Sequence, residues 1–377
     1  MSNTNSLANT SLTTAEQLAR EELIDMVPYQ SARRLFASAE QTAGEEKIWL
    51  NASEAPGLGD YQLSANNINR YPDFQPESLI NAYSDYAGLI KTQVLATRGA
   101  DEGIELIIRS FCKAYQDSIL ICPPTYGMYA ISAENHGADI VKVPLKPDDL
   151  TLDLDGLAQQ VGKVKVVFLC SPGNPTGNLL PREQIVAAIE LFKNNAMVVI
   201  DEAYIEFSPE QTSAKLLSDY DNVIVLRTLS KAFALAGLRC GFTLANEDVI
   251  TLLSKVIAPY PISAPVAEIA SQALTSKCNI MTERVAVTNS LRNELSKWLQ
   301  EQSWCQQVFT SNANFILFRC SNDEVKTTIF DLLVANNILI RDQSKQQQLA
   351  SCLRISIGSE QEIAKLKQVL TKQLSIS

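Results

Sequence analysis

The sequence predicts an α/β fold, in which a large domain with a doubly wound, mainly parallel sheet is joined to a smaller α+β domain. Short apolar runs typical of strands buried on both faces alternate with helical patterns through most of the chain. Several of these runs end in a turn that carries polar side chains, which is where open α/β sheets bind their ligands. With 377 residues, of which 46% are hydrophobic, the chain is long enough for about two domains.

The junctions between strands and turns come in order along the chain. Residues 94–109 pass from a strand through a glycine turn into a helix, whose free backbone N–H groups at Ala100 and Asp101 make a candidate anion site. A plain strand-to-helix joint is the alternative. The next strand, residues 118–122, runs into Pro-Pro-Thr-Tyr, so that Tyr126 could stack on a flat ligand or simply belong to the core.

The rest of the chain continues this alternation. Further strands are predicted at residues 139–143, 164–170, 196–201, 223–226 and 240–244, with a helix at residues 181–192 that has proline in its first turn. Residues 263–303 are predicted to form one long amphipathic helical stretch that connects the two domains. The small domain is predicted to contain strands near residues 314–318 and 352–357, a helix at 323–336 and a terminal helix from 361.

The composition narrows the classes of function. A net charge of −10 and a pI near 4.9 argue against nucleic-acid backbones and anionic membranes as partners, because nothing offsets the overall repulsion. The eight cysteines lie at least ten residues apart, so there is no Cys-x-x-Cys metal or redox pair. The single histidine, His136, is expected at the surface end of a helix, and it nearly excludes imidazole triads and His-rich metal sites. No metal site is predicted.

The sequence also bears on location. No apolar run approaches the roughly 20 residues that span a bilayer, and the N-terminus lacks an apolar signal core. We therefore expect a cytoplasmic protein whose cysteines are small buried hydrophobic residues in a reducing compartment. Residues 1–18, rich in Ser, Thr and Asn, are predicted to be a disordered tail.

The most informative junction carries Lys231. This lysine follows the strand of residues 223–226, stands beside Ser230, and precedes Arg239 by eight residues. A hydroxyl and a guanidinium suit an anion such as a phosphate held near the amine. A lysine with a phosphate site next to it suggests a Schiff base to pyridoxal phosphate. For a lone Ser-Lys pair, a surface lysine that ends a strand is the commoner explanation.

Two earlier junctions bear on this choice. Asp201 ends a strand, and a pyridine cofactor needs a carboxylate at its ring nitrogen, because the protonated ring withdraws electrons from the substrate. An Asp at this position could instead cap a helix. Tyr204 follows three residues later. Asn174 lies between Gly173 and Pro175 after the strand of residues 164–170, in what would by itself be a tight turn.

Taken in order, these stretches resemble the fold-type I aminotransferases that use pyridoxal phosphate, over roughly residues 25–360. The stretches are Ser171-Pro-Gly-Asn-Pro-Thr-Gly177, Asp201-Glu-Ala-Tyr204, Ser230-Lys-Ala-Phe233 and Gly237-Leu-Arg-Cys-Gly241. Narrower motifs look like the histidinol-phosphate aminotransferase family: Pro28-Tyr-Gln-Ser-Ala-Arg-Arg-Leu35, Trp49-Leu-Asn-Ala-Ser-Glu54, Asn69-Arg-Tyr-Pro-Asp73, Pro123-Pro-Thr-Tyr-Gly-Met-Tyr129 and Ile257-Ala-Pro-Tyr-Pro-Ile-Ser263.

The resemblance implies an enzyme of histidine biosynthesis that exchanges an amino group between L-histidinol phosphate and 2-oxoglutarate, with pyridoxal 5'-phosphate as cofactor. Its catalytic residues would be Lys231, Asp201 and Tyr204, with Lys231 forming the Schiff base. Cofactor-binding roles fall to Ala100, Asp101, Tyr126, Asn174, Asp201, Tyr204, Thr228, Ser230, Lys231, Arg239 and, from a neighbouring subunit, Tyr71. Substrate-binding roles fall to Tyr29, Asn174, Tyr260, Arg341 and Arg354.

The resemblance also implies a homodimer and a domain plan. After the tail, residues 19–50 would form an arm that packs on the small domain and on the dimer partner. Residues 51–262 would form the large cofactor-binding domain, and residues 263–377 the interdomain helix with the small domain. Small-molecule substrates are the other expected partners, without nucleic acid or membrane.

Alternatives of the same fold stay open at this point. A threonine-phosphate decarboxylase shares the site chemistry and differs in which bond at Cα stands perpendicular to the cofactor ring, which sequence does not reveal. An aromatic amino-acid aminotransferase is a second alternative. A ligand-sensing transcription regulator would need a DNA-binding domain, and the mostly uncharged residues before Glu21 cannot provide one.

Overall fold

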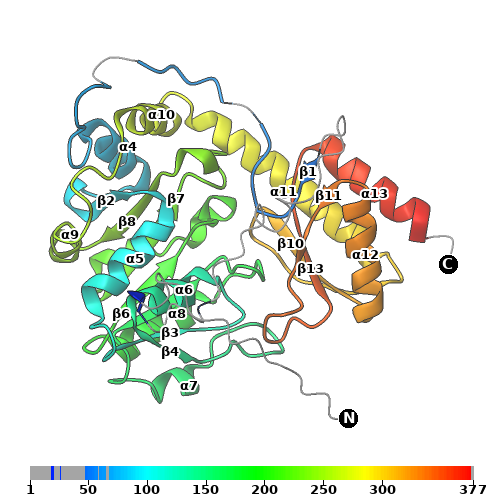
Figure 1. Ribbon diagram of the computed structural model, residues 1–377, viewed down its shortest axis with the longest axis horizontal. Coiled ribbons are helices and arrows are strands. Elements are labelled where there is room, and N and C mark those ends of the chain that lie inside the picture. The colour runs from blue at the N-terminus through cyan, green and yellow to red at the C-terminus, as the bar shows by residue number, and fades with distance from the viewer. Residues whose placement is uncertain (1–17, 21–25, 27–46, 58, 65–67, 375–377) are drawn as a thin grey trace, which may run out of the picture.

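The computed structural model describes residues 18–20, 26, 47–57, 59–64 and 68–374 (Figure 1). Two bodies of secondary structure lie side by side, and each is built on its own sheet. The predictions for the tail of residues 1–18 and the arm of residues 19–50 fall almost wholly outside the described residues, and the prediction for Tyr29 falls outside them altogether.

The large sheet has seven strands in the order β2-β8-β7-β6-β5-β3-β4. They are β2 (Val94–Thr97), β3 (Ser118–Ile121), β4 (Asp139–Lys142), β5 (Val166–Cys170), β6 (Met197–Asp201), β7 (Val223–Thr228) and β8 (Gly241–Ala245). Neighbours pair in parallel except at β8, which is antiparallel to both β2 and β7. The predicted mainly parallel sheet is confirmed, and each predicted strand lies within two residues of its predicted bounds.

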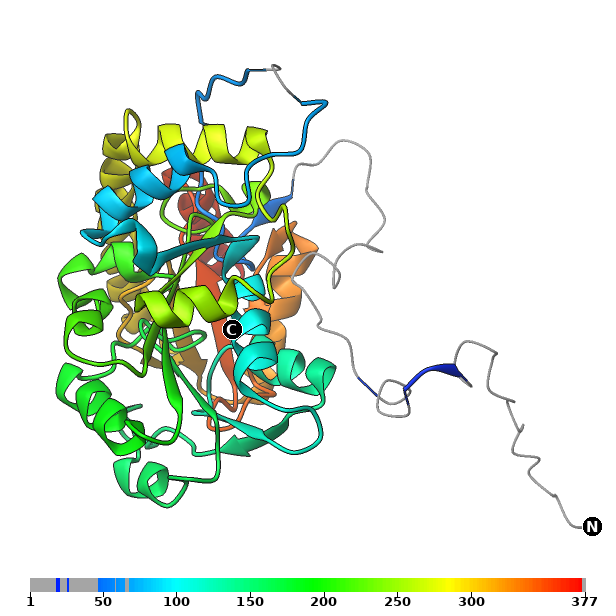
Figure 2. The same cartoon turned by 90° about the vertical axis from the view of Figure 1, so that its left-hand side faces the viewer.

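Helices cover both faces of this sheet (Figure 2). One face carries α4 (Glu77–Ala87), α7 (Leu154–Ala158), α8 (Arg182–Phe192) and α10 (Ala264–Leu274), and the other carries α5 (Gly99–Phe111), α6 (Met128–His136) and α9 (Glu247–Leu253). Alternate residues of β5 point to the two sides: Val167 joins one buried cluster and Phe168 the other. A strand buried in this way has no polar face, which explains the continuous apolar runs in the sequence.

The second body is α+β, as predicted. Its antiparallel sheet has the order β12-β13-β10-β9, and a parallel pair, β1 with β11, lies beside it. The elements are β1 (Ile48–Trp49), β9 (Cys305–Val308), β10 (Phe315–Cys320), β11 (Ile338–Leu339), β12 (Arg341–Asp342), β13 (Cys352–Ser356), α11 (Cys278–Gln300), α12 (Asp323–Ala335) and α13 (Glu360–Leu374). The short strands β1, β9, β11 and β12 were not predicted, because two to four residues leave little periodicity to detect.

The predicted single helical stretch of residues 263–303 is wrong in one respect, since it consists of two helices, α10 and α11. The break falls at Thr275, whose backbone angles (φ −111°, ψ −91°) lie outside the helical region. Leu274 packs in the core of the large sheet, whereas Leu295 packs in that of the small sheet. Met281 of α11 still packs in the core of the large sheet, so the chain changes core within α11 and not at the break. The domain boundary at residue 263 stays a prediction.

Short 3-10 helices complete the fold. They are η1 (Lys91–Gln93), η2 (Ile205–Phe207), η3 (Pro209–Gln211), η4 (Ala214–Ser218) and η5 (Ala236–Leu238). His136 ends α6 as predicted, but it is only half-exposed, and its Nε2 lies 2.8 Å from the carbonyl oxygen of Cys112.

Candidate active site

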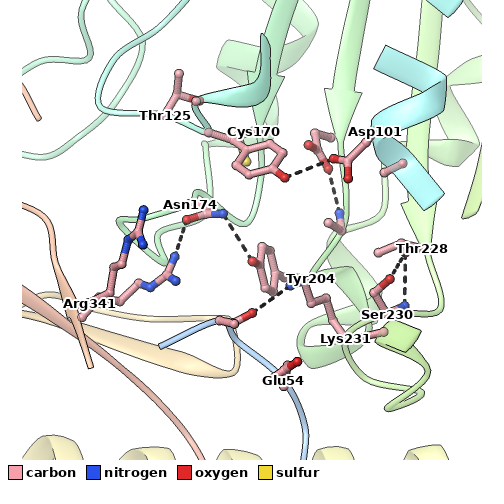
Figure 3. Close-up of a pocket in the computed structure, with 18 of the residues that line it drawn as sticks. Glu54, Asp101, Thr125, Cys170, Asn174, Tyr204, Thr228, Ser230, Lys231 and Arg341 are labelled. Atoms are coloured by element: carbon pink, nitrogen blue, oxygen red, sulfur yellow. Dashed lines mark hydrogen bonds between the residues drawn. The ribbon is translucent and has the colours of Figure 1, made fainter. Parts of the chain in front are cut away.

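One pocket gathers most of the predicted site residues (Figure 3). It is a cavity of about 380 Å³ between the carboxyl ends of the parallel strands and the strands β12 and β13 of the small sheet. The predicted residues that line it are Ala100, Asp101, Tyr126, Asn174, Asp201, Tyr204, Thr228, Ser230, Lys231, Arg239, Arg341 and Arg354. The pocket therefore lies at the edge of the sheet where α/β folds bind ligands.

Lys231 lies in the turn that follows β7. Its Nζ donates a hydrogen bond to the carbonyl oxygen of Ala52 (3.2 Å) and lies 5.6 Å from the centre of the Tyr204 ring. Ala52 belongs to the loop after β1, so the amine is held between the large sheet and a segment that starts in the small body. A primary amine in such a pocket can form an imine with a carbonyl group or carry a proton.

Asp201, the last residue of β6, is only 3% exposed. Its Oδ2 accepts a hydrogen bond from the hydroxyl of Tyr129 (2.6 Å), and its Oδ1 accepts one from the backbone N–H of Ala203 (3.0 Å). Burial raises the pKa of Asp201 to about 6, and the two hydrogen bonds act in the opposite direction. The carboxylate is thus held in a dry setting where a positively charged donor would be its natural partner.

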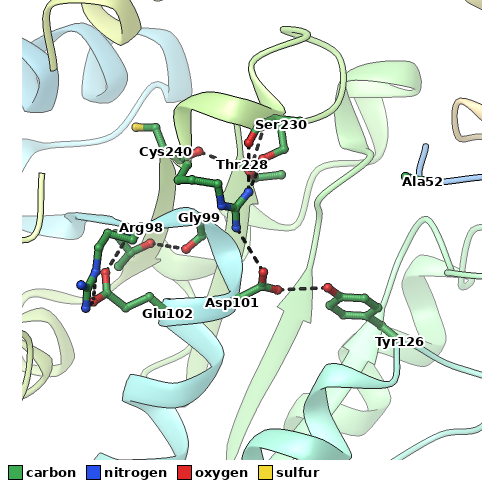
Figure 4. A network of polar contacts seen from close by, with 12 residues as sticks. Ala52, Arg98, Gly99, Asp101, Glu102, Tyr126, Thr228, Ser230 and Cys240 are labelled. Atoms are coloured by element: carbon green, nitrogen blue, oxygen red, sulfur yellow. Dashed lines mark hydrogen bonds and ion pairs between the residues drawn. The ribbon is translucent and has the colours of Figure 1, made fainter. Parts of the chain in front are cut away.

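The start of α5 meets the turn after β7 at a second polar cluster (Figure 4). Arg239 Nη1 lies 3.4 Å from Ser230 Oγ, and Arg239 Nη2 pairs with Asp101 Oδ2 at 3.2 Å. Thr228 Oγ1 lies 2.9 Å from Ser230 Oγ. Gly99 makes room for this cluster, because a Cβ at its φ of +77° would lie 2.6 Å from Arg239 Nη2. Hydroxyls, a guanidinium and the N–H groups of a helix start together suit a phosphate.

Asn174 links the two sides of the pocket. Its Nδ2 donates to the hydroxyl of Tyr204 (3.4 Å), and its Oδ1 accepts from Nη1 of Arg354 (2.6 Å). Burial raises the pKa of Tyr204 to about 12, although the Arg354 charge lowers it, so the phenol stays protonated at neutral pH. The position of Tyr126 is restrained as well, because its hydroxyl donates a hydrogen bond to Asp101 Oδ1 at 3.1 Å.

Two arginines form the wall on the side of the small sheet. Arg341 of β12 stands directly opposite Arg354 of β13 in the antiparallel register. Arg354 is 7% exposed, donates from Nη2 to the carbonyl oxygen of Asn51 (3.1 Å), and lies over the ring of Phe315 at 4.9 Å. Two guanidinium groups on one wall suit a second anion, separate from the one at Arg239.

Several residues that line the pocket were not among the predicted ones. Those with functional groups in their side chains are Asn51, Glu54, Thr125, Cys170, Gln343 and Gln346, and the others are Ala52, Gly127, Ala203 and Ala236. Cys170 could have been found, because it ends β5 and pairs with Asp201 in the register of the parallel strands. Gln343 and Gln346 carry no local signal, because only tertiary packing brings their loop to the pocket. Gln346 Nε2 donates to Gln343 Oε1 at 3.1 Å.

Two predicted residues do not join this pocket. Tyr71 and Tyr260 stack on each other (ring centroids 4.4 Å apart, planes at 15°) and are 81% and 49% exposed. Neither lines the pocket of its own chain. The role of Tyr71, which depends on a second subunit, and the substrate-binding role of Tyr260 stay predictions.

A search of the described residues found no group of three or more His, Cys, Asp or Glu side chains that could hold a metal ion. None of the helices in the described part of the chain is long and apolar enough to cross a membrane. The eight cysteines are free thiols, five of them buried and three partly buried. The cytoplasmic location stays a prediction.

The residues present fit pyridoxal 5'-phosphate. The polar cluster around Arg239 suits its phosphate, and the primary amine of Lys231 suits its aldehyde. The buried carboxylate of Asp201 suits its ring nitrogen. The carboxylate is the most specific of the three, because its hydrogen bonds come from neutral groups and leave its charge for a ligand to balance.

Comparisons with known proteins agree with this chemistry. The family model described as aminotransferase class I and II matches residues 41–370. A curated histidinol-phosphate aminotransferase of Colwellia psychrerythraea (strain 34H) is 69% identical over 363 residues, which cover 94% of this chain and 99% of that protein. One from Yersinia enterocolitica is 50% identical over 351 residues, covering 93% and 91%.

A solved structure agrees in fold. The crystal structure of histidinol-phosphate aminotransferase from Sinorhizobium meliloti, in complex with pyridoxal-5'-phosphate, matches with a TM-score of 0.82 at 24% identity, covering 97% of this chain and 100% of that one. The chain therefore belongs to the class I and II aminotransferases and, within them, to the histidinol-phosphate aminotransferase family that its motifs predicted.

Proposed function

We propose that this protein is a pyridoxal-phosphate-dependent transaminase of histidine biosynthesis, which exchanges the amino group between L-histidinol phosphate and 2-oxoglutarate. The observation that carries the proposal is a pocket lined by two groups of side chains that suit anions. One group surrounds Arg239, and the other consists of Arg341 and Arg354. Relatives at 69% and 50% identity that bear this enzyme name support the choice of substrates.

The cofactor, when bound, withdraws electrons from the amino donor's Cα and so makes the proton on that carbon acidic. Asp201 would balance the positive charge of the ring nitrogen. The phosphate would be held by Ser230, Thr228, Arg239 and the N–H groups at the start of α5, which line the pocket. Tyr126 offers its ring for stacking, and Asn174 with Tyr204 offers hydrogen bonds to the ring oxygen.

Lys231 then acts on the proton. Its amine lies inside the pocket beside the Tyr204 ring, so with the cofactor bound it could take the proton from the donor's Cα and deliver it to the carbon of the cofactor's aldehyde group. A general base positioned in this way contributes about 10²–10⁴-fold to the rate.

The two arginines hold the amino donors. Glutamate carries an α-carboxylate where histidinol phosphate carries a phosphate ester, so one guanidinium must receive both groups in turn. Arg354 is suited to this task, because a planar fork can bind either group in a bidentate manner. Arg341 stands beside it in the register and supplies further donors for the phosphate.

The proposal includes a homodimer. Tyr71 and Tyr260 form an exposed aromatic pair outside the pocket of their own chain. In the dimer, Tyr71 would reach the cofactor phosphate of the neighbouring subunit. Hybrid dimers of Lys231→Ala and Tyr71→Phe test this point, because exchange would redistribute the two defects between sites. Activity equal to the simple sum of the two homodimers, after verified subunit exchange, would refute the crossing.

The central experiment follows glutamate formation. Purified holoenzyme is mixed with histidinol phosphate and 2-oxoglutarate, with Lys231→Ala as the control. We expect glutamate and a keto phosphate from the wild type, and at least about 10²-fold slower turnover in the variant. Histidinol phosphate has no carboxylate to lose, so threonine phosphate is offered in a separate reaction, where evolved CO2 in place of a keto product would indicate the decarboxylase instead. A clear preference for phenylalanine or tyrosine over histidinol phosphate would indicate the aromatic aminotransferase.

A further inference from the structure

Tyr129 is a buried phenol that the proposed mechanism does not yet use. It belongs to the first turn of α6, and it is fully buried. Its hydroxyl donates to Oδ2 of Asp201 at 2.6 Å, a short distance for a hydrogen bond between a phenol and a carboxylate. The two residues are 72 positions apart in the sequence, so the contact is made entirely by the fold.

The packing around Tyr129 leaves its ring little freedom. The ring stacks on Phe168 of β5, with centroids 4.7 Å apart and planes at 10°. On another side it meets the ring of Tyr126 edge to face, at 5.6 Å and 87°. The hydroxyl of Tyr126 in turn donates a hydrogen bond to Asp101. Aromatic side chains have only two rotatable angles, so these contacts direct the phenol at Asp201 at a low entropic cost.

The electrostatics of the pair favour a charged carboxylate. Asp201 is too deeply buried to be solvated by water, and burial alone would favour its protonated form. The Tyr129 hydroxyl and the Ala203 N–H are the two groups whose hydrogen bonds favour the carboxylate instead. Burial, and then the negative charge of Asp201, raises the pKa of Tyr129 well above that of an ordinary phenol. Tyr129 therefore remains a hydrogen-bond donor at every pH at which the enzyme would work.

We propose that Tyr129 is a positioning residue that acts through Asp201: its phenol keeps the carboxylate ionised and oriented to meet the ring nitrogen of the cofactor. This inference rests on the proposed function, because it needs a cofactor with a basic ring nitrogen. Tyr129 itself does not line the pocket, so its effect on a ligand passes through the carboxylate.

The test compares cofactor binding in apoprotein variants, without substrate. Tyr129→Phe removes the hydroxyl and keeps the ring that stacks on Phe168. Tyr83→Phe is the matched control, because it removes another buried phenol hydroxyl, in α4, from a residue that does not line the pocket. Asp201→Asn and the double variant with Tyr129→Phe complete a double-mutant cycle. The dissociation constant of pyridoxal 5'-phosphate is measured from about pH 5.5 to 8.5, and thermal unfolding verifies that each variant is folded.

We expect Tyr129→Phe to weaken cofactor binding roughly tenfold or more near neutral pH, the effect of losing a hydrogen bond to a charged group. The pH below which binding declines should also move upward, because the carboxylate then protonates more easily. Tyr83→Phe should bind within about twofold of the wild type, a change too small to indicate a lost contact. In the Asp201→Asn background, Tyr129→Phe should have little further effect.

Equal effects of Tyr129→Phe in both backgrounds would overturn the inference, since they would show that the phenol acts through packing alone. An unchanged affinity and pH dependence would overturn it as well. The proposed function fails separately, if the wild type binds the cofactor and yet forms no glutamate from histidinol phosphate and 2-oxoglutarate. A wild type that does not bind the cofactor would refute both.

Discussion

Two neighbouring carboxylates at the end of β6, Asp201 and Glu202, are both buried but have different kinds of partner. Asp201 is 3% exposed and Glu202 1% exposed. Glu202 pairs with the guanidinium of Arg227 at 2.8 Å, and it also accepts hydrogen bonds from the Thr212 hydroxyl and the Ser213 N–H. Asp201 accepts its hydrogen bonds from the neutral phenol of Tyr129 and from a backbone N–H.

This difference in partners suggests that Glu202 contributes to stability and Asp201 to function. The charge of Glu202 is balanced within the chain by Arg227, so removing one partner of this buried pair is expected to destabilise the fold. The charge of Asp201 faces the pocket, where the positive ring nitrogen of a cofactor would balance it. Buried polar groups that the chain leaves for a ligand to satisfy are a physical mark of a site. Four substitutions can break or sharpen this contrast.

The largest expected effect is on stability. Glu202→Gln leaves the guanidinium of Arg227, a residue that is 6% exposed, without its ion-pair partner, and such a loss costs about 3–5 kcal/mol of unfolding free energy. Chemical denaturation of the apoprotein measures it, and the protein that remains folded should keep its activity. Glu190→Gln is the matched control, because its ion pair with Lys193 is about half exposed on both sides, and about 1 kcal/mol or less is expected. Equal losses in the two variants would contradict the contrast.

The second effect is on activity. Asp201→Asn keeps the shape of the side chain and removes its charge, so turnover should fall by about 10²-fold or more, the scale for a removed electrostatic partner. Its unfolding free energy should not fall as that of Glu202→Gln does. Single-turnover kinetics and denaturation of the same preparations provide both numbers. Near-normal turnover would remove Asp201 from its role at the ring nitrogen.

The third effect concerns the substrate wall. Arg341→Ala should weaken histidinol phosphate by roughly ten- to a hundredfold, the loss expected for one charge-assisted hydrogen bond. Histidinol, which lacks the phosphate, should be affected much less. The single-turnover rate is measured against the concentration of each donor. An equal loss for both donors would refute the phosphate role of Arg341.

The smallest effect tests a third buried carboxylate, Glu206, which is 5% exposed. Burial raises the pKa of Glu206 to about 7, although the Arg227 charge lowers it. The folded chain thus binds this proton more tightly than the unfolded chain, so stability should fall as the pH rises from about 4.5 towards 7. Glu206→Gln should make this fall shallower, by an amount on the order of 1 kcal/mol. Parallel stability curves for the variant and the wild type would contradict this.

The sequence was most informative where chemistry follows a strand directly. Asn174, Asp201 and Lys231 each stand just beyond a buried apolar run, and parallel strands bring such ends together. All three line the pocket. Motifs of this kind, in which polar residues directly follow a buried strand, were enough to predict both the family and the fold.

Contacts that arise only from tertiary packing could not be predicted from the sequence. Tyr129 reaches Asp201 across 72 positions, and Arg354 reaches Asn174 across 180. The loop with Gln343 and Gln346 enters the pocket from the small sheet without any pattern that predicts it. The break at Thr275 was also missed, because residues 266–303 contain no glycine or proline that would signal it.

The hydrogen bonds of Arg354 have a consequence for the entropy of binding. Its guanidinium is held by Asn174 Oδ1 and the Asn51 carbonyl oxygen, and it rests on the Phe315 ring, before any substrate arrives. A free arginine side chain loses about 2 kcal/mol of rotamer entropy when it is fixed. Here the side chain of Arg354 is already ordered by folding, so an anion that binds to it does not have to order it. Two donors of different shape can then share one anchor point, and the pocket need not reorder this side chain between half-reactions.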